Sequence, residues 1–327
     1  MKNKLSILGF VLIVGALIFS GCGPTPKPRT PTPVFKSIEN SLIVFEKEGK
    51  VFLLESLNSQ PIEVAEGNTP TLSPDRSRIA YVKMDEDNDI HIYEVRTGKI
   101  ETLNTDEWRL RGVSWSPNGK YLITDSGTAC VGAGGVYEYP TGRKITSFTT
   151  YGKTEWISDE EFVFVEPQEV SPMRPYGGGE GSGLSKITLP SGERQLLAQA
   201  TALDDFGLLK VENGIIYFSK TTVESSDDWA FPDRGEVSYW QMDSNGGGKR
   251  TITKPETLRE KVISELPTEF SEYGISYGPI PHLDEKNWVI FAISKGGSVY
   301  DDLICIMNLN NPKESFMNIV KGAYPSW

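Results

Sequence analysis

The last six residues of the chain resemble the opening of a repeat that occurs twice earlier. Residues 322–327 are similar to the beginnings of residues 68–75 and 112–119, and both earlier copies run through a Ser-Pro-Asp or Ser-Pro-Asn turn into a second, more apolar strand. At the C-terminus no second strand follows, whereas residues 41–45 near the N-terminus read as a second strand with no first strand before it. We therefore predict that the two ends of the chain pair and close a ring of repeats.

Internal similarity along the chain supports a ring of six units. The clearest units span residues 69–105 and 109–149, and both consist of short β-branched and aromatic segments joined by turns rich in Gly, Asp and Asn. Weaker units follow at 154–197, 207–252 and 274–319, and the two chain ends make up a sixth. Six four-stranded units predict an all-β fold, a six-bladed β-propeller closed by pairing the C-terminal strand with the N-terminal blade. A β-sandwich, or a propeller with another number of blades, is the alternative.

Two of these units carry a family resemblance. Their Ser-Pro-Asp and Ser-Pro-Asn-Gly turns, the segments 79–82 and 90–95, and the Thr-Gly turns resemble the propeller domain of the TolB family. The same WD40-like (PD40-type) repeats occur in the propellers of prolyl-oligopeptidase-type enzymes. The resemblance extends over residues 41–327 and implies a binding role in the cell envelope. TolB has an additional N-terminal α/β domain that we do not recognise in this sequence, so the resemblance does not imply a Tol-type translocation role.

The N-terminal segment has the order of a secretory signal. Lys2 and Lys4 precede an apolar run over residues 5–19, and Ser20 and Gly21 lead to Cys22. The apolar run is shorter than the ~20 residues that a membrane-spanning helix needs. Residues 18–22 resemble a bacterial lipobox, in which the cysteine is lipidated. We predict a signal peptide over residues 1–21 and a lipid anchor on Cys22, on the extracytoplasmic face of a bacterial membrane (periplasm or cell surface). A plain secretory signal is the alternative.

Composition bounds the rest of the chain. Residues 23–33 read GPTPKPRTPTP, which favours extended polyproline II, so we predict a linker over residues 22–40 and one propeller domain over residues 41–327. The net charge of −11 argues against nucleic-acid binding, which depends on Lys and Arg. Cys130 and Cys305 fall on opposite sides of the predicted ring, and we expect both to be free and buried. We expect a monomer.

The predicted functional face is the one that carries the long loops. In a four-stranded blade, the loops between the second and third strands emerge on the same face as the connections between blades, and four of these loops are long (residues 126–134, 167–182, 221–235 and 295–302). Aromatic residues and arginines of the kind that anchor interfaces fall on this face, namely Trp108, Arg109, Arg111, Arg174, Tyr176, Trp229, Phe231 and Tyr300. We predict that they bind a cell-envelope protein. A glycan or another small ligand is the alternative if aromatic side chains line the mouth of the central channel, and simple packing over the ring is the other.

Catalytic motifs are weak in this sequence. Residues 274–278 match the G-x-S-x-G pattern, but one blade takes up the rest of the chain, and His282 follows too closely for an α/β-hydrolase. Residues 85–89 resemble half of a calcium loop but lack its Gly and its final Glu. His91 and His282 are the only histidines and have no metal-ligand spacing. We predict no catalytic residue, metal site or cofactor; a propeller-only lyase or hydrolase remains the third alternative.

Overall fold

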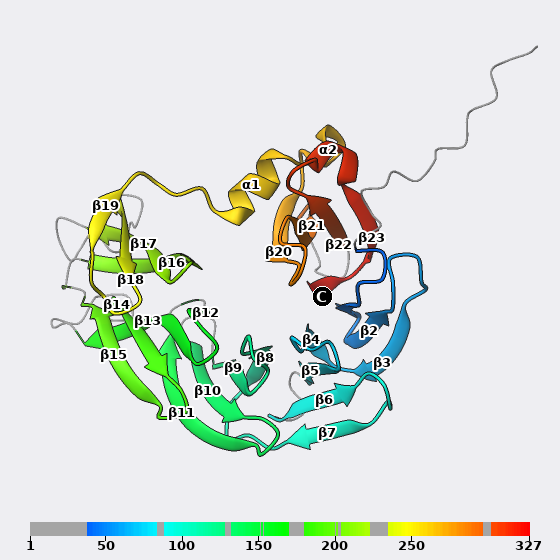
Figure 1. The fold of residues 1–327 in the computed structure, drawn as a ribbon, viewed down its shortest axis with the longest axis horizontal. Helices are drawn as coiled ribbons and strands as arrows, with labels where there is room; N and C mark the ends of the chain where they lie inside the picture. The colour runs from blue at the N-terminus through cyan, green and yellow to red at the C-terminus, as the bar shows by residue number, and fades with distance from the viewer. Residues whose placement is uncertain are drawn as a thin grey trace, which may run out of the picture.

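The computed structural model describes residues 38–83, 88–127, 132–150, 152, 154–169, 180–199, 201, 204–222, 235–296 and 302–327 (Figure 1). Its strands form six antiparallel sheets of four strands each, which follow one another around a common centre. This arrangement confirms the predicted all-β class and the six four-stranded units, and it is that of a six-bladed propeller.

The first three complete sheets follow the order of the chain, each with its first strand nearest the centre of the ring (Figure 1). The first consists of β4 (Asn68–Leu72), β5 (Arg78–Val82), β6 (Ile90–Glu94) and β7 (Ile100–Leu103). The second consists of β8 (Leu110–Trp115), β9 (Tyr121–Gly127), β10 (Gly132–Glu138) and β11 (Arg143–Thr150). The third consists of β12 (Thr154–Trp156), β13 (Glu161–Glu169), β14 (Glu180–Thr188) and β15 (Glu193–Ala198).

The remaining sheets include the one that both chain ends share. One sheet consists of β16 (Asp204–Glu212), β17 (Ile215–Thr222), β18 (Glu236–Asp243) and β19 (Arg250–Ile252). The next consists of β20 (Gly274–Pro281), β21 (Trp288–Ser294), β22 (Leu303–Asn308) and β23 (Met317–Lys321). The split sheet has the order β24 (Ala323–Ser326), β1 (Ile43–Lys47), β2 (Lys50–Leu54) and β3 (Ile62–Glu66). The short helices are α1 (Leu258–Ser264), a 3₁₀ turn (Thr268–Phe270) and α2 (Pro312–Ser315).

The repeated turn explains why two sheets match so closely in sequence. Ser73 donates its hydroxyl to the Asp75 carboxylate at 2.6 Å and accepts the backbone N–H of Arg78 at 3.0 Å. In the next sheet Ser116 donates to the Asn118 side chain at 2.7 Å and accepts the backbone N–H of Tyr121 at 2.9 Å. The serine therefore closes the turn in both places, and Asp or Asn is required as its acceptor.

The split sheet joins the two ends of the described chain. β24 pairs antiparallel with β1, with Val44 opposite Ser326 and Glu46 opposite Ala323. Trp327 is buried in a hydrophobic cluster that includes Phe45 of β1. Ile38, which precedes the predicted start of the domain, is fully buried in the same cluster. The pairing predicted for the C-terminal strand is therefore present.

Neighbouring sheets share hydrophobic cores, with one exception among the described residues. Five buried clusters each join two adjacent sheets, from the sheet β20–β23 through the split sheet and onward to β16–β19. The sixth cluster joins β20–β23 to α1, whose Val262 is fully buried and whose Leu258 is partly buried. No cluster formed by the described residues joins β16–β19 directly to β20–β23, and the segment with α1 runs between them (Figure 1). Closure of the ring at this side remains a prediction.

Two further expectations concern a cysteine and the long loops. Cys305 is fully buried with a free thiol, as predicted, and burial raises the pKa of this thiol to about 12; Cys130 lies outside the described residues. The predicted loop over residues 167–182 is too long, because β13 and β14 continue their pairing as far as Glu169 opposite Glu180. Cross-strand pairing here overrides the low strand propensity of Pro and Gly.

Candidate functional site

A cavity lies at one mouth of the ring, and its volume is about 530 Å³. It is lined by the first strands β4, β8, β12, β20 and β24, together with parts of β9, β10 and β11. Its lining residues lie near the beginnings of these first strands, on the end of the ring where the second and third strands of each sheet are connected; we call this end the long-loop face. The cavity, which we call the mouth pocket, therefore lies on the face that the sequence predicted to be functional.

Hydroxyl groups dominate the polar lining of the mouth pocket. The hydroxyl-bearing residues are Thr69, Thr71, Ser114, Thr124, Thr150, Thr154, Tyr277 and Tyr324. Thr124 is committed to the protein, because its hydroxyl donates to the Gly135 carbonyl at 3.2 Å and accepts the Gly135 N–H at 2.7 Å. The hydroxyls of Thr71, Ser114 and Thr154 make no side-chain hydrogen bond with the described residues. They are available to a ligand.

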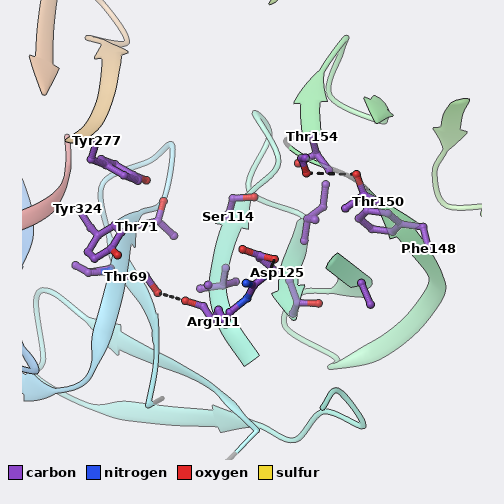
Figure 2. Close-up of a pocket in the computed structure, with 17 residues that line it drawn as sticks. Thr69, Thr71, Arg111, Ser114, Asp125, Phe148, Thr150, Thr154, Tyr277 and Tyr324 are labelled. Atoms are coloured by element: carbon purple, nitrogen blue, oxygen red, sulfur yellow. Dashed lines mark hydrogen bonds and ion pairs between the residues drawn. The ribbon is translucent and has the colours of Figure 1, made fainter. Parts of the chain in front are cut away.

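One ion pair supplies the charge of the pocket. Arg111 of β8 donates through a terminal guanidinium nitrogen to the Asp125 carboxylate of β9 at 3.0 Å (Figure 2). The Asp125 side chain is 61% exposed and that of Arg111 is 37% exposed, so the pair contributes at most ~1 kcal/mol to folding. The Arg111 Nε is buried and has no hydrogen-bond partner among the described residues. The pair is thus available for recognition and is not needed to hold the two strands together.

Two tyrosines form one side of the pocket. The Tyr277 and Tyr324 rings lie edge to face with centroids 5.1 Å apart, across the pocket from Phe148, Thr150 and Thr154 (Figure 2). Burial raises the pKa of the Tyr277 phenol, which is therefore protonated at neutral pH. The pocket offers an aromatic wall facing a polar one.

Thr69 and Tyr324, which we call the rim residues of the mouth pocket, have an unusual backbone conformation. Thr69 and Tyr324 have φ angles of +47° and +50°, a region that costs β-branched and bulky residues conformational energy. Buried Glu46 fixes the first of these, since it accepts the Thr69 N–H at 3.0 Å and the Asn68 side-chain amide at 3.0 Å. The Thr69 hydroxyl then donates to the Arg111 carbonyl at 2.9 Å.

These rim residues were not predicted from the sequence, although a signal for them is present in it. The strands β4 and β24 both begin with the spacing Gly-x-x-Pro, as Gly67 to Pro70 and Gly322 to Pro325. Both glycines have φ near +155°, at +154° and +159°, and a side chain at either would collide with Tyr81 or Phe45. The shared spacing thus marks a rim element that occurs in two sheets.

Three of the predicted site residues are described, and they lie together on the long-loop face. Trp108 is 60% exposed, and the Arg109 guanidinium lies over its ring at 4.7 Å from the centroid. Arg111, two residues on, lines the mouth pocket. The other predicted residues lie outside the described part of the chain and remain predictions: Cys22, Arg174, Tyr176, Trp229, Phe231 and Tyr300.

The segment that carries Trp108 is firmly anchored. Just before it, Asp106 and Glu107 accept the Tyr137 phenol at 2.9 and 3.0 Å, and Glu107 also accepts the Ser126 hydroxyl at 3.0 Å. Burial, together with these carboxylates, raises the pKa of Tyr137, so the phenol remains a donor. The exposed Trp108 therefore projects from a fixed base, which lowers the entropy lost when it binds.

The structure contains a Ser–His pair, but it is enclosed. The His282 Nε2 lies 2.9 Å from the Ser41 hydroxyl, and both residues are less than 5% exposed. The His282 Nδ1 accepts the backbone N–H groups of Asp284 and Glu285, so no carboxylate orients the ring. Ser276 of the G-x-S-x-G match lies within strand β20 and not at a strand-to-helix turn. The pair fastens the region where β20 meets the N-terminal segment.

Neither a metal-ligand cluster nor a membrane-spanning helix occurs in the described part of the chain. In this part of the chain, no three residues among His, Cys, Asp and Glu are placed to hold a metal ion. Likewise, none of the helices described is long and apolar enough to cross a membrane.

No protein-family model matches the chain, and no curated protein does. Among solved structures, TolB from Acinetobacter baumannii is similar with a TM-score of 0.45 at 17% identity, over 88% of this chain and 65% of that one. In fold, this chain resembles TolB. The β-propeller domain of the Trilobed protease from Pyrococcus furiosus is similar with a TM-score of 0.45 at 13% identity, over 86% of this chain and 81% of that one. An oligogalacturonate lyase in complex with manganese is similar with a TM-score of 0.44 at 12% identity, over 83% of this chain and 70% of that one.

Proposed function

We propose that this chain is a non-catalytic β-propeller, tethered to a bacterial membrane through lipidated Cys22, that binds a cell-envelope protein with its long-loop face. The observation that carries the proposal is the exposed pair Trp108 and Arg109, 60% exposed at Trp108, on a fixed segment beside the mouth pocket. Large aromatic and Arg side chains of this kind dominate the binding energy of protein interfaces. The Pro-rich linker would hold this face some 30 Å from the bilayer, at ~3.1 Å per residue.

A non-catalytic role agrees with the chemistry of the described residues. Their one Ser–His pair is enclosed, and none of the described residues that line the pocket beside the Arg111–Asp125 pair is a histidine or a cysteine. A general acid or base with an open path to substrate is what a lyase or hydrolase requires. We further propose that the ring closes between β16–β19 and β20–β23, so that the long-loop face is continuous and the protein acts as a monomer.

The test is proximity crosslinking in intact cells followed by capture of the full-length protein. The double variant Trp108→Ala/Arg109→Ala is compared with Leu283→Ala, which removes an exposed apolar side chain from the turn between β20 and β21 on the opposite face. We expect one dominant protein partner. The amount captured should fall at least tenfold in the double variant and should be unchanged in Leu283→Ala. Absence of a partner above background, or equal capture by both variants, would contradict the proposal.

A second candidate function is favoured by the mouth pocket. A cavity of about 530 Å³ lies within the range of about 300–1,000 Å³ typical of small-ligand sites. Protein interfaces need no such cavity. Binding of a small envelope ligand is therefore the second candidate.

A further inference from the structure

We propose that the mouth pocket is a carbohydrate-binding site that takes a neutral, hydroxyl-rich ligand, recognised by Arg111, Asp125 and Tyr277. This inference rests on the second candidate function, small-ligand binding in the mouth pocket, and does not depend on the protein-binding role proposed for Trp108 and Arg109.

The charge of the pocket selects a neutral ligand. Among the described residues that line it, Arg111 and Asp125 are the only charged ones, and they neutralise each other at 3.0 Å. A charged ligand that contacts one member of the pair would also lie beside the other member, whose charge repels it. Neighbouring hydroxyls of a sugar instead satisfy both, because one donates to the carboxylate while another accepts from the guanidinium.

The uncommitted hydroxyls point to the same class. Thr71, Ser114 and Thr154 come from three different sheets and line one cavity without side-chain hydrogen bonds to the described residues. Each hydroxyl donates once and accepts twice, which matches a ligand whose own groups are both donors and acceptors.

The aromatic wall completes the match. Tyr277 and Tyr324 are half-buried, and a sugar ring has an apolar C–H face that packs on aromatic side chains. The Tyr277 phenol stays protonated, so it donates a hydrogen bond as well as offering ring surface. The pocket thus combines one apolar wall with a few convergent polar groups, as small-ligand sites do.

The test uses the full-length protein and a panel of neutral oligosaccharides built from hexoses and N-acetylhexosamines. Acidic oligosaccharides and acidic peptides of similar size serve as competing classes. Binding is measured by an array and then by calorimetry for wild type, Arg111→Gln, Asp125→Asn and Tyr277→Phe. Arg143→Gln is the matched control, because Arg143 forms an exposed ion pair with Glu138 in the turn between β10 and β11.

We expect at least one neutral oligosaccharide to bind. Affinity should fall about tenfold or more in Arg111→Gln and in Asp125→Asn, since each loses a hydrogen bond to a charged group, and severalfold in Tyr277→Phe. Arg143→Gln should bind as wild type does, and melting temperatures should show that all variants are folded. Lack of binding to every neutral oligosaccharide overturns the proposal, as does preferred binding of the acidic ligands or unchanged affinity in both Arg111→Gln and Asp125→Asn.

Discussion

Two junctions between sheets differ in a way that the sequence did not suggest. Where the chain ends meet, β24 completes the split sheet, and Trp327 packs in one cluster with Trp288 of the neighbouring sheet. Between β16–β19 and β20–β23, by contrast, the described residues form no common cluster, and α1 covers the β20–β23 side. As far as the described residues show, the junction made by the two termini is thus the better packed of the two.

The comparison shows where a ring of this kind is held together. A strand contributed from the far end of the chain places hydrogen bonds and a large apolar side chain at the join. The linker that carries α1 packs against the β20–β23 sheet only. Among the described residues, the β16–β19 sheet shares a hydrophobic cluster only with the preceding sheet, β12–β15. The weakest junction should therefore be the one that the continuous chain makes between β16–β19 and β20–β23.

The largest decrease in the free energy of unfolding should come from removing residues 323–327. This deletion takes away strand β24 and the buried Trp327, and loss of a buried Trp side chain alone costs ~3–5 kcal/mol. Total stability of a domain is about 5–15 kcal/mol, so the truncated protein should be largely unfolded. Thermal and denaturant unfolding measure this, with Tyr324→Phe as a control that keeps the strand. A truncated protein that melts like wild type would show that the terminal pairing is not needed.

A smaller effect should follow from weakening α1. Val262 is fully buried against the β20–β23 sheet, whereas its neighbour Ile263 is 45% exposed. Val262→Ala should lower the free energy of unfolding by about 2 kcal/mol, because it removes buried methyl groups and leaves a cavity. Ile263→Ala, on the same helix, should change it by less than about 0.5 kcal/mol. Equal effects of the two changes would mean that α1 does not pack as described.

The smallest effect concerns pH at the terminal junction. Burial, and then the Arg76 guanidinium, lowers the pKa of His282 below its ordinary value of 6.5, although Asp284 and Glu285 oppose this shift. The folded protein thus prefers neutral His282, while the unfolded chain takes up a proton as the pH falls through about 6.5. The contribution of neutral His282 to the free energy of unfolding is therefore fully present above about pH 6.5. It is lost progressively as the pH falls from there to the lowered pKa of the folded protein.

Protonation would also place an N–H on Nδ1, which now accepts two backbone N–H groups. We expect a loss on the order of 1 kcal/mol between about pH 7.5 and 5.5, comparable with one buried hydrogen bond. Denaturant unfolding at several pH values, for wild type and His282→Asn, measures it. The slope should be reduced in the variant, and an unchanged slope would assign the pH dependence to other groups.

The sequence predicts much of the fold because its repeats carry local information. The serine turns at Ser73 and Ser116 fix two hairpins by hydrogen bonds within a few residues, and strand periodicity extends the pattern to the weaker units. The pocket could not be predicted in the same way. Arg111 was identified only as an exposed arginine, and Tyr277 and Tyr324 meet from β20 and β24, the first strands of two neighbouring sheets. Such contacts depend on ring geometry that no local pattern encodes.

The most direct test of this account is native-state hydrogen exchange, followed residue by residue in the full-length protein. It reports the free energy of opening for each sheet. The account predicts that the amides of β24 exchange as slowly as those of β1, and that β16–β19 and α1 open earlier. If β24 exchanges first, as a frayed terminus would, and β16–β19 exchanges last, the terminal strand is not the element that holds the ring together.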